Sequence, residues 1–340
     1  MLLLAGDIGG TNTRLAAYEL GEGQLAGGGL TPTPQVLRPV AEETFPSAAQ
    51  ASLDAIVQVF VATHSLRVEH AGFGVAGPVV HGRAQVTNLP WVVDSTNLAR
   101  TLGVASVSLI NDLEAIAYGI PALAAEDFLV LNAGAPDATG NAAVIAAGTG
   151  LGVAGLYWDG VIHRPIASEG GHIDFGPADA LQAELLQHLQ RRWPHVSYER
   201  VVSGPGLVNL YEFLRDTGRG TEQPAVAAAL GRGDPAAAIT SAALAGTCAL
   251  CQQALELFVA IYGAAAGNVA LAFKATAGLY IGGGIAPKIR PALEQRSTFV
   301  DAFLAKGRLE DLLHGIPVRV IMNDRAGLLG AARCAALRAA

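Results

Sequence analysis

The chain has 340 residues, of which 51% are hydrophobic and 15% are charged, and its formal net charge is −7. A chain of this length is expected to form two domains, and this much apolar material can fill two cores without disulfides or a structural metal. The 22 Lys and Arg residues are scattered along the sequence, which argues against a nucleic-acid-binding surface.

A mean hydropathy of +0.38 raises the question of a membrane. In the most apolar stretch, 242–273, polar residues and three glycines interrupt any run of ~20 apolar residues, and the polar ones are Gln252, Gln253, Glu256 and Asn268. We therefore expect a buried helix or helix pair and no membrane span. Residues 1–4 lead straight into a predicted strand without a basic region or cleavage site, so we expect no secretory signal.

The chain has three cysteines, an odd number for a disulfide framework. Cys248 and Cys251 have the spacing of a metal or redox motif, but no second pair completes a zinc site. They lie in an apolar helical pattern, which predicts small buried thiols and a reducing compartment, the cytoplasm.

The N-terminal segment predicts a strand–turn–strand hairpin. Two apolar runs, 2–7 and 15–20, flank the glycine-rich turn 8–12. Further along, a glycine cluster over 21–29 predicts a loop, and the apolar spacing over 47–64 predicts a helix.

A strand that ends in a turn is predicted over 71–78, then a short buried strand over 107–110 and a helix over 112–120. The N-terminal pattern then returns about 140 residues later, with apolar runs 142–147 and 153–157 around the turn 148–152. This internal similarity predicts a duplicated architecture.

Beyond residue 201 the pattern is mostly helical, with a segment rich in Gly, Pro and Thr over 216–235. A last strand is predicted over 318–322, followed by a C-terminal helix. Strands that alternate with helices, together with hairpins, predict the α/β class with mixed sheets.

The two glycine-rich turns have the composition of phosphate-binding loops. Glycine lets backbone N–H groups approach an anion closely, and Thr11 and Thr149 add hydroxyl donors. Asp7 would repel a phosphate directly, so we expect a Mg²⁺ ion between them, held through water. An ordinary tight hairpin is the alternative for one such turn, but two matched copies favour phosphate binding.

A third glycine cluster, 282–284, follows the predicted strand 278–281 and is suited to lie against a nucleobase. The sequence contains neither a Walker A loop nor the dinucleotide fingerprint with its acidic partner.

These segments resemble the sugar kinases of the actin/hexokinase superfamily. Residues 4–14 resemble its phosphate-1 motif, 147–154 its phosphate-2 motif and 278–287 its adenosine motif. Three further segments are similar to the bacterial glucokinase family, and they are 110–115, 168–175 and 199–207. The order and spacing agree along essentially the whole chain. The zinc-binding Cys/His cluster of the related repressor/ORF/kinase family is missing, and Ala146-Ala147 stand where Gly-Pro is expected in closer relatives.

The resemblance implies a two-domain actin-like, ribonuclease H-like ATPase fold with a cleft between a smaller and a larger domain. We expect residues 1–110 plus about 320–340 to form the small domain and 111–319 the large one. It also implies ATP and Mg²⁺ as cofactors and a cytoplasmic homodimer. The implied nucleotide-binding residues are Asp7, Gly9, Gly10, Thr11, Asn12, Gly148, Thr149, Gly150, Gly283 and Gly284.

Asp112 follows a buried strand at the start of a predicted helix. Such a residue can be a helix N-cap, an acid of the first helical turn, or a general base. The resemblance implies the base, which accepts the proton of the attacking sugar hydroxyl, and it implies that Asn111 hydrogen-bonds the sugar beside it.

Glu169 and His172 lie in the sequence Glu-Gly-Gly-His, whose glycine pair disfavours a helix and therefore a helical zinc-ligand pair. A loop with an acid and an imidazole suits recognition of several sugar hydroxyls, and a structural histidine is the alternative. The resemblance implies that Glu169, His172 and Glu199 bind the sugar. Without it, Glu199 could be a surface acid of a helix.

The implied activity is that of an ATP:D-hexose 6-phosphotransferase, a glucokinase, which makes glucose 6-phosphate in the first step of glycolysis. Mannose or fructose is an alternative substrate, because selectivity depends on how each hydroxyl is paired. A non-catalytic sugar-sensing regulator would need a helix-turn-helix ahead of the first loop, and we expect no room for one before Asp7. A phosphate-hydrolysing relative would have no need for the sugar-binding set.

Overall fold

The computed structural model describes residues 1–21, 37–231, 233–295 and 297–339. The chain forms two compact units: Met1–Phe128 with Leu156–Ala167 and Asn323–Ala340, and Leu129–Gly155 with Ser168–Met322. The boundaries of these units differ from those of the predicted domains, and the predicted domain division stays a prediction. Apart from Gly21, the loop predicted over 21–29 lies outside the described residues.

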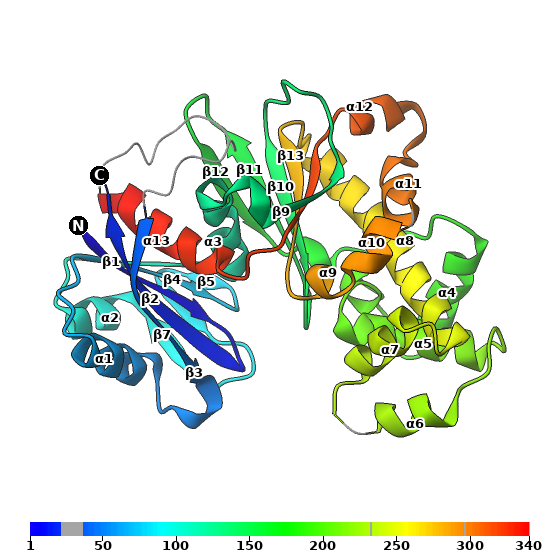
Figure 1. Ribbon diagram of the computed structural model, residues 1–340, viewed down its shortest axis with the longest axis horizontal. Coiled ribbons are helices and arrows are strands. Elements are labelled where there is room, and N and C mark those ends of the chain that lie inside the picture. The colour runs from blue at the N-terminus through cyan, green and yellow to red at the C-terminus, as the bar shows by residue number, and fades with distance from the viewer. Residues whose placement is uncertain (22–36, 232, 296, 340) are drawn as a thin grey trace. The chain divides into compact units, whose positions relative to one another are not determined.

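The first unit is built on a mixed sheet with the order β3-β2-β1-β4-β8 (Figure 1). Strands β1 and β2 form the predicted hairpin and pair antiparallel, whereas β1, β4 and β8 run parallel to one another. The strands are β1 (Leu2–Ile8), β2 (Asn12–Leu20), β3 (Leu37–Pro46), β4 (His70–Val75) and β8 (Val107–Asn111). A smaller sheet contains β5 (Val79–Val80), β6 (Arg83–Gln85) and β7 (Val92–Asp94).

Alternate residues of β1 enter two different cores, as expected of a strand covered on both faces. Leu4 and Ile8 pack in the core that contains α1 and α2, whereas Leu3 and Ala5 pack against α13. Helix α3 also packs against α13. These helices are α1 (Leu53–Thr63), α2 (Ser95–Leu102), α3 (Asp112–Gly119) and α13 (Ala326–Ala339), and the short 3₁₀ turns are Ser47–Ala49, Ile120–Ala122 and Ala125–Asp127.

The second sheet has the order β12-β11-β10-β13-β14-β9. Strand β9 lies at one edge of this sheet. The other five strands, numbered in chain order, lie as third, second, first, fourth and fifth, as the five strands of the first sheet do. The predicted duplication is therefore confirmed by strand topology. The strands are β9 (Phe128–Asn132), β10 (Ala142–Ala147), β11 (Leu151–Trp158), β12 (His163–Ser168), β13 (Gly278–Gly282) and β14 (Val318–Ile321).

Helices make up most of the second unit after residue 201, as predicted. They are α4 (Ala180–Gln190), α5 (Gly204–Asp216), α6 (Pro224–Leu230), α7 (Pro235–Leu244), α8 (Ala249–Phe273), α9 (Ile285–Lys288), α10 (Arg290–Gln295), α11 (Thr298–Leu304) and α12 (Glu310–His314). Three 3₁₀ turns complete the unit, at Gly170–His172, Tyr198–Arg200 and Gly307–Leu309.

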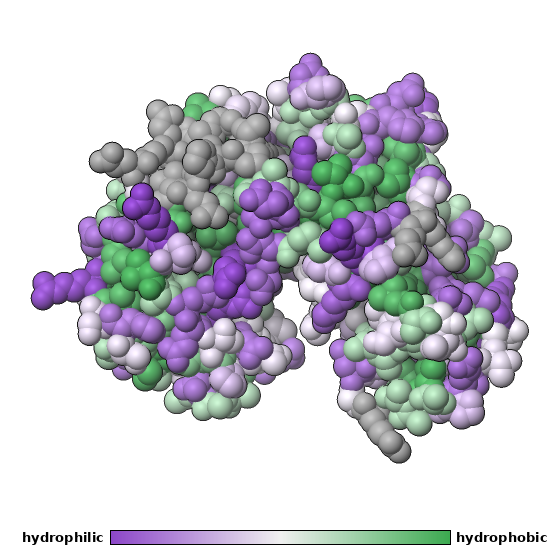
Figure 2. Space-filling model, in the orientation of Figure 1, coloured by the Kyte–Doolittle hydropathy of each residue, from purple (hydrophilic) through white to green (hydrophobic). Residues whose placement is uncertain are grey.

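The apolar stretch that raised the question of a membrane contains the end of α7 and the whole of helix α8. By length and composition α8 could cross a membrane, but 78% of its apolar window is buried inside the protein. Cys248 and Cys251, at its start, are buried free thiols, as predicted. Helix α8 is therefore a core helix, and its apolar surface is used for packing. On the face of the molecule shown in Figure 2, hydrophilic side chains lie among hydrophobic ones over the described residues.

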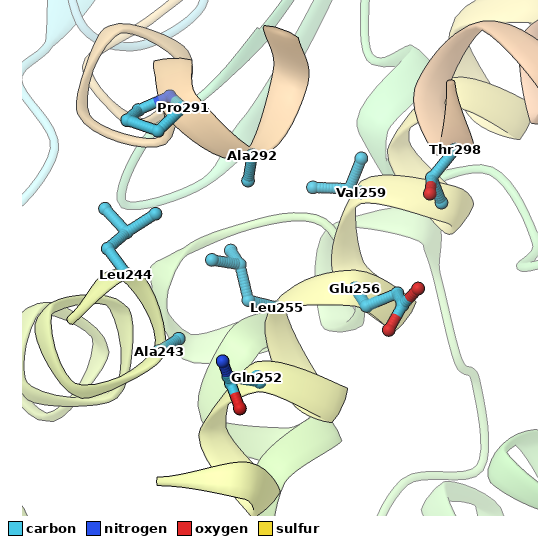
Figure 3. A pocket seen from close by; sticks show the side chains of 9 residues that line it. All are labelled: Ala243, Leu244, Gln252, Leu255, Glu256, Val259, Pro291, Ala292 and Thr298. Carbon is cyan, nitrogen blue, oxygen red and sulfur yellow. The ribbon is translucent and has the colours of Figure 1, made fainter. Parts of the chain in front are cut away.

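A cavity of about 160 Å³ lies among helices of the second unit. Figure 3 shows Leu255 and Leu244 pointing into the space below Pro291 and Ala292. Its lining contains none of the predicted site residues and consists of Ala243, Leu244, Gln252, Leu255, Glu256, Val259, Pro291, Ala292 and Thr298.

Candidate active site

The first glycine turn, between β1 and β2, is closed by its own backbone and fixed from outside. The Gly9 N–H donates to the carbonyl of Asn12 at 3.0 Å, and the Ser47 hydroxyl donates to the Gly9 carbonyl at 2.8 Å. A Cβ on Gly10 would lie 2.7 Å from the carbonyl oxygen of Thr87, so only glycine fits there. Thr11 and Asn12 are exposed. The turn is thus held rigidly, with two polar side chains free of the core.

Asp7 is the last residue but one of β1, just before this turn. Burial raises the pKa of its carboxyl group, Arg14 lowers it and Asp324 raises it again. Arg14 and Asp324 themselves form an ion pair at 3.0 Å. A buried carboxylate with so little compensation favours a cation beside it.

Asn111 and Asp112 share the junction between β8 and α3. Asn111 is the helix N-cap: its side-chain oxygen accepts from the N–H of Leu113 at 2.8 Å, and Glu114 accepts from its backbone N–H at 3.0 Å. Its amide nitrogen donates to the carbonyl of Gly77 at 3.0 Å. The Asn111 side chain also forms a hydrogen bond that lowers the pKa of Asp112, and its amide oxygen keeps a second lone pair for a ligand.

Asp112 is the first residue of α3, so it is an acid of the first turn and the capping role belongs to Asn111. One carboxylate oxygen accepts from the Leu113 N–H at 2.9 Å. Burial raises the pKa of Asp112 to about 6, against that hydrogen bond, and the nearby Asp7 carboxylate raises it further. A carboxylate with this pKa is ionised at neutral pH and is a stronger base than an ordinary aspartate.

The second glycine turn joins β10 to β11 in the other unit. The Gly148 N–H donates to the carbonyl of Gly150 at 2.8 Å, and Thr149 between them is exposed. The Gly283–Gly284 turn follows β13, which runs parallel to β10 and pairs with it. Because carboxyl ends of neighbouring parallel strands meet at one sheet edge, both turns lie at that edge.

Gly283 requires glycine, because its φ is +82° and a Cβ would overlap the carbonyl of Ala147. Gly284 has open space around its Cα. This surface admits a flat group close to the backbone.

The three predicted sugar residues of the second unit come from two 3₁₀ turns that contact each other. Glu169 is the N-cap of the turn Gly170–His172 and His172 is its last residue, so this segment forms one short 3₁₀ turn and no α-helix, in line with the glycine pair. His172 and Glu199 are 4.0 Å apart, measured from the imidazole Nε2 to the carboxylate Oε2. Glu169 and His172 are exposed.

The structure thus forms two groups, each within one unit. Asp7, the first glycine turn, Asn111 and Asp112 belong to the first unit, and the other predicted residues belong to the second. Two supporting residues escaped sequence reasoning. Glu114 could have been found, since an Asn followed three residues later by Glu is a capping-box pattern. Ser47 gave no such signal, because its partner Gly9 is 38 positions away.

A family model described as Glucokinase matches residues 4–338 of this chain. The Glucokinase of Nostoc sp. (strain PCC 7120) is 43% identical over 98% of this chain and 99% of its own length. A crystal structure of glucokinase from an Antarctic psychrotroph is 33% identical, with a TM-score of 0.85 and 99% of each chain covered.

A ROK family glucokinase from Streptomyces griseus, solved with glucose and AMPPNP, shares the fold at 22% identity, with a TM-score of 0.63 and coverage of 99% of this chain and 100% of that one. The predicted actin-like ATPase fold is thereby confirmed. With a family match over nearly its whole length, this chain belongs to the glucokinase family.

Proposed function

We propose that this protein transfers the γ-phosphoryl group of ATP to the 6-hydroxyl of D-glucose, with Asp112 as the general base. Membership of the glucokinase family supports the activity. The observation that carries the assignment of the base is the Asp112 carboxylate, partly buried at the start of α3 with its pKa raised to about 6. Only one of its oxygens accepts the Leu113 N–H, so the other has a lone pair for a sugar hydroxyl.

In the proposed reaction the glucose O6 attacks the γ-phosphorus, the O6–P bond forms and the bond to the β–γ bridging oxygen breaks. The hydroxyl proton moves to Asp112, and ADP leaves with the electron pair of the broken bond. Such a transfer depends on positioning and on donors aimed at the phosphoryl oxygens more than on covalent catalysis. Backbone N–H groups of the two glycine turns, with Thr11 and Thr149, would supply those donors.

The residues present fit a Mg²⁺ ion bound through water. Asp7 is a buried oxygen donor whose raised pKa reports poor compensation of its charge. No group of three or more His, Cys, Asp or Glu side chains suited to a metal occurs among the described residues. Mg²⁺ is commonly held by one or two carboxylates, substrate phosphates and water, so Asp7 alone suffices. The ion would neutralise charge on the phosphates.

We propose that Asn111, Glu169, His172 and Glu199 bind the sugar and that Gly283 and Gly284 lie against the adenine. Each sugar residue keeps hydrogen-bonding capacity: the Asn111 amide oxygen has a second lone pair, Glu169 and His172 are exposed, and the Glu199 side chain is 29% exposed. A cytoplasmic homodimer stays a prediction.

A coupled ADP-release assay with Mg-ATP and a panel of D-glucose, D-mannose and D-fructose tests the function. We expect the highest kcat/KM with glucose, and we expect glucose 6-phosphate as the product. ADP release that does not depend on sugar would refute the proposal. A higher kcat/KM with mannose or fructose would make that sugar, and not glucose, the preferred substrate.

A further inference from the structure

Glu199, a predicted sugar residue, is hydrogen-bonded to the second glycine turn. Its Oε2 atom accepts the backbone N–H of Leu151 at 3.0 Å, and Leu151 directly follows Gly150 at the start of β11. The side chain is 29% exposed, so the carboxylate is partly shielded yet open to a ligand. A charge-assisted bond in such a place is stronger than a neutral one. This hydrogen bond therefore fixes the backbone at Leu151, where the 148–150 turn enters β11.

Gly150 is shaped to admit this carboxylate. A Cβ at Gly150 would lie 2.5 Å from Glu199 Oε2 and 3.4 Å from its Cδ. Nothing lies within 4 Å of a Cβ placed on Gly148, at the other end of the same turn. The glycine at position 150 is thus required by the carboxylate that lies against it.

The segment that carries Glu199 also holds the other end of the turn. The N–H of Gly204 donates to the carbonyl of Gly148 at 2.9 Å. Ser203 lies between Glu199 and Gly204 in sequence. Its hydroxyl donates a hydrogen bond to the backbone carbonyl of Glu199 at 2.7 Å and accepts one from the Gly206 N–H, which caps α5. Residues 199–204 are therefore hydrogen-bonded to the turn at both ends, through Leu151 and Gly148.

We propose that Glu199 is a positioning residue for the 148–150 turn as well as a sugar ligand, so that sugar and nucleotide binding are coupled through one carboxylate. This inference rests on the proposed function of both groups of residues. His172 Nε2, of a proposed sugar ligand, lies 4.0 Å from the same oxygen. If one carboxylate serves both sites, displacing it through Gly150 weakens sugar binding and removing it weakens nucleotide binding, and each bound ligand alters the affinity for the other by the same factor.

The first test measures nucleotide affinity without sugar. Titration calorimetry with Mg²⁺ and the non-hydrolysable analogue AMPPNP is applied to Glu199→Ala and Glu199→Gln. We expect Glu199→Ala to bind AMPPNP about 10-fold more weakly, because a hydrogen bond to a charged group is lost. Glu199→Gln should recover most of this affinity, since its amide oxygen can accept the Leu151 N–H. Glu184→Ala, which removes an exposed carboxylate paired with Arg219 in the same unit, is the control.

The second test runs in the opposite direction and measures glucose affinity without nucleotide. In Gly150→Ala the new methyl group meets only the end of a flexible side chain, so the protein can fold with Glu199 displaced. We expect about 10-fold weaker glucose binding in this variant and unchanged glucose binding in Gly231→Ala, a control in the same unit whose added Cβ would meet its nearest atom only at 3.8 Å. Adding Gly150→Ala to Glu199→Ala should cost no further glucose affinity, since the interaction is already absent.

The outcomes separate the inference from the function it rests on. Wild-type AMPPNP affinity in Glu199→Ala overturns the positioning role, even if glucose binding is lost. Wild-type glucose affinity in Glu199→Ala removes Glu199 from the sugar site but leaves the nucleotide result to decide the positioning role. If Gly150→Ala does not fold, the AMPPNP titrations of the Glu199 variants decide alone.

Discussion

At the scale of single residues, the junction of β8 and α3 assigns different tasks to two neighbouring side chains. Asn111 caps the helix through Leu113 and, with Glu114, forms a capping box. That leaves Asp112 free of the capping role, with burial and the Asp7 carboxylate raising its pKa to about 6. A base with a pKa near the working pH is both ionised and proton-accepting, which suits general-base catalysis.

Asp112→Asn keeps the size and shape of the side chain but removes the base. We expect kcat to fall by about 10²–10⁴-fold while glucose still binds, because proton transfer is lost and the hydrogen bond to the sugar is kept. Steady-state kinetics and glucose titration measure the two quantities. A turnover like that of the wild type would remove Asp112 from the mechanism.

The raised pKa of Asp112 also sets the acid side of the pH profile. Since only the ionised form accepts a proton, we expect kcat/KM of the wild-type protein to decline below about pH 6. An ordinary aspartate would keep activity down to about pH 4. Measurement of kcat/KM between about pH 5 and about pH 8, roughly one to two units on either side of that pKa, distinguishes the two. A flat profile would contradict the raised pKa or the role of Asp112 as the base.

The same shift makes the ionised carboxylate a cost to folding. Because the folded protein holds the Asp112 proton more tightly than the unfolded chain does, this cost is full above the folded pKa and disappears below the unfolded pKa of about 4. We expect Asp112→Asn to be more stable than the wild type by about 1–3 kcal/mol at pH 8 and equally stable near pH 4. Urea denaturation at both pH values provides the measurement.

At the scale of elements, α3 is positioned by glycines that let backbones touch. A Cβ on Gly330 of α13 would overlap the carbonyl of Ala115 in α3, and one on Gly74 of β4 would lie 2.7 Å from the Ala115 methyl group. Because α3 begins at Asp112, this close packing sets the position of the proposed base.

We expect Gly330→Ala to destabilise the protein by about 1–3 kcal/mol, although alanine favours a helix, because the added methyl group forces α3 and α13 apart. Thermal or urea unfolding measures the change. Gly231→Ala is the control, since Gly231 has an ordinary φ of −79° and a Cβ there would meet its nearest atom only at 3.8 Å. Equal stabilities of the two variants would contradict the role given to the α3–α13 contact.

At the scale of the whole molecule, the proposed base and the proposed sugar ligands Glu169, His172 and Glu199 belong to different units. The proposed function requires both sets of residues to contact the same glucose molecule, with water kept from the phosphoryl group. We expect glucose to reduce the radius of gyration of the protein, and small-angle scattering with and without the sugar measures it. Galactose at the same concentration is the comparison sugar, and an unchanged radius with glucose would count against compaction on glucose binding.

The amino-acid sequence by itself determined the hairpins, the glycine turns, the start of α3 and the duplicated strand pattern. All of these depend on local features: apolar runs that form strands, glycines that permit turns, and a polar pair at a helix start. The family motifs occur in the same local segments, so they too could be found from sequence.

Tertiary structure alone decided which hydrogen-bond donor meets which acceptor. The bond from Leu151 to Glu199 joins residues 48 positions apart, and the bond from Ser47 to Gly9 joins residues 38 apart. Such contacts depend on how distant segments pack, and no local pattern contains that information. The raised pKa of Asp112 has the same origin, because it comes from the neighbours that bury the carboxyl group.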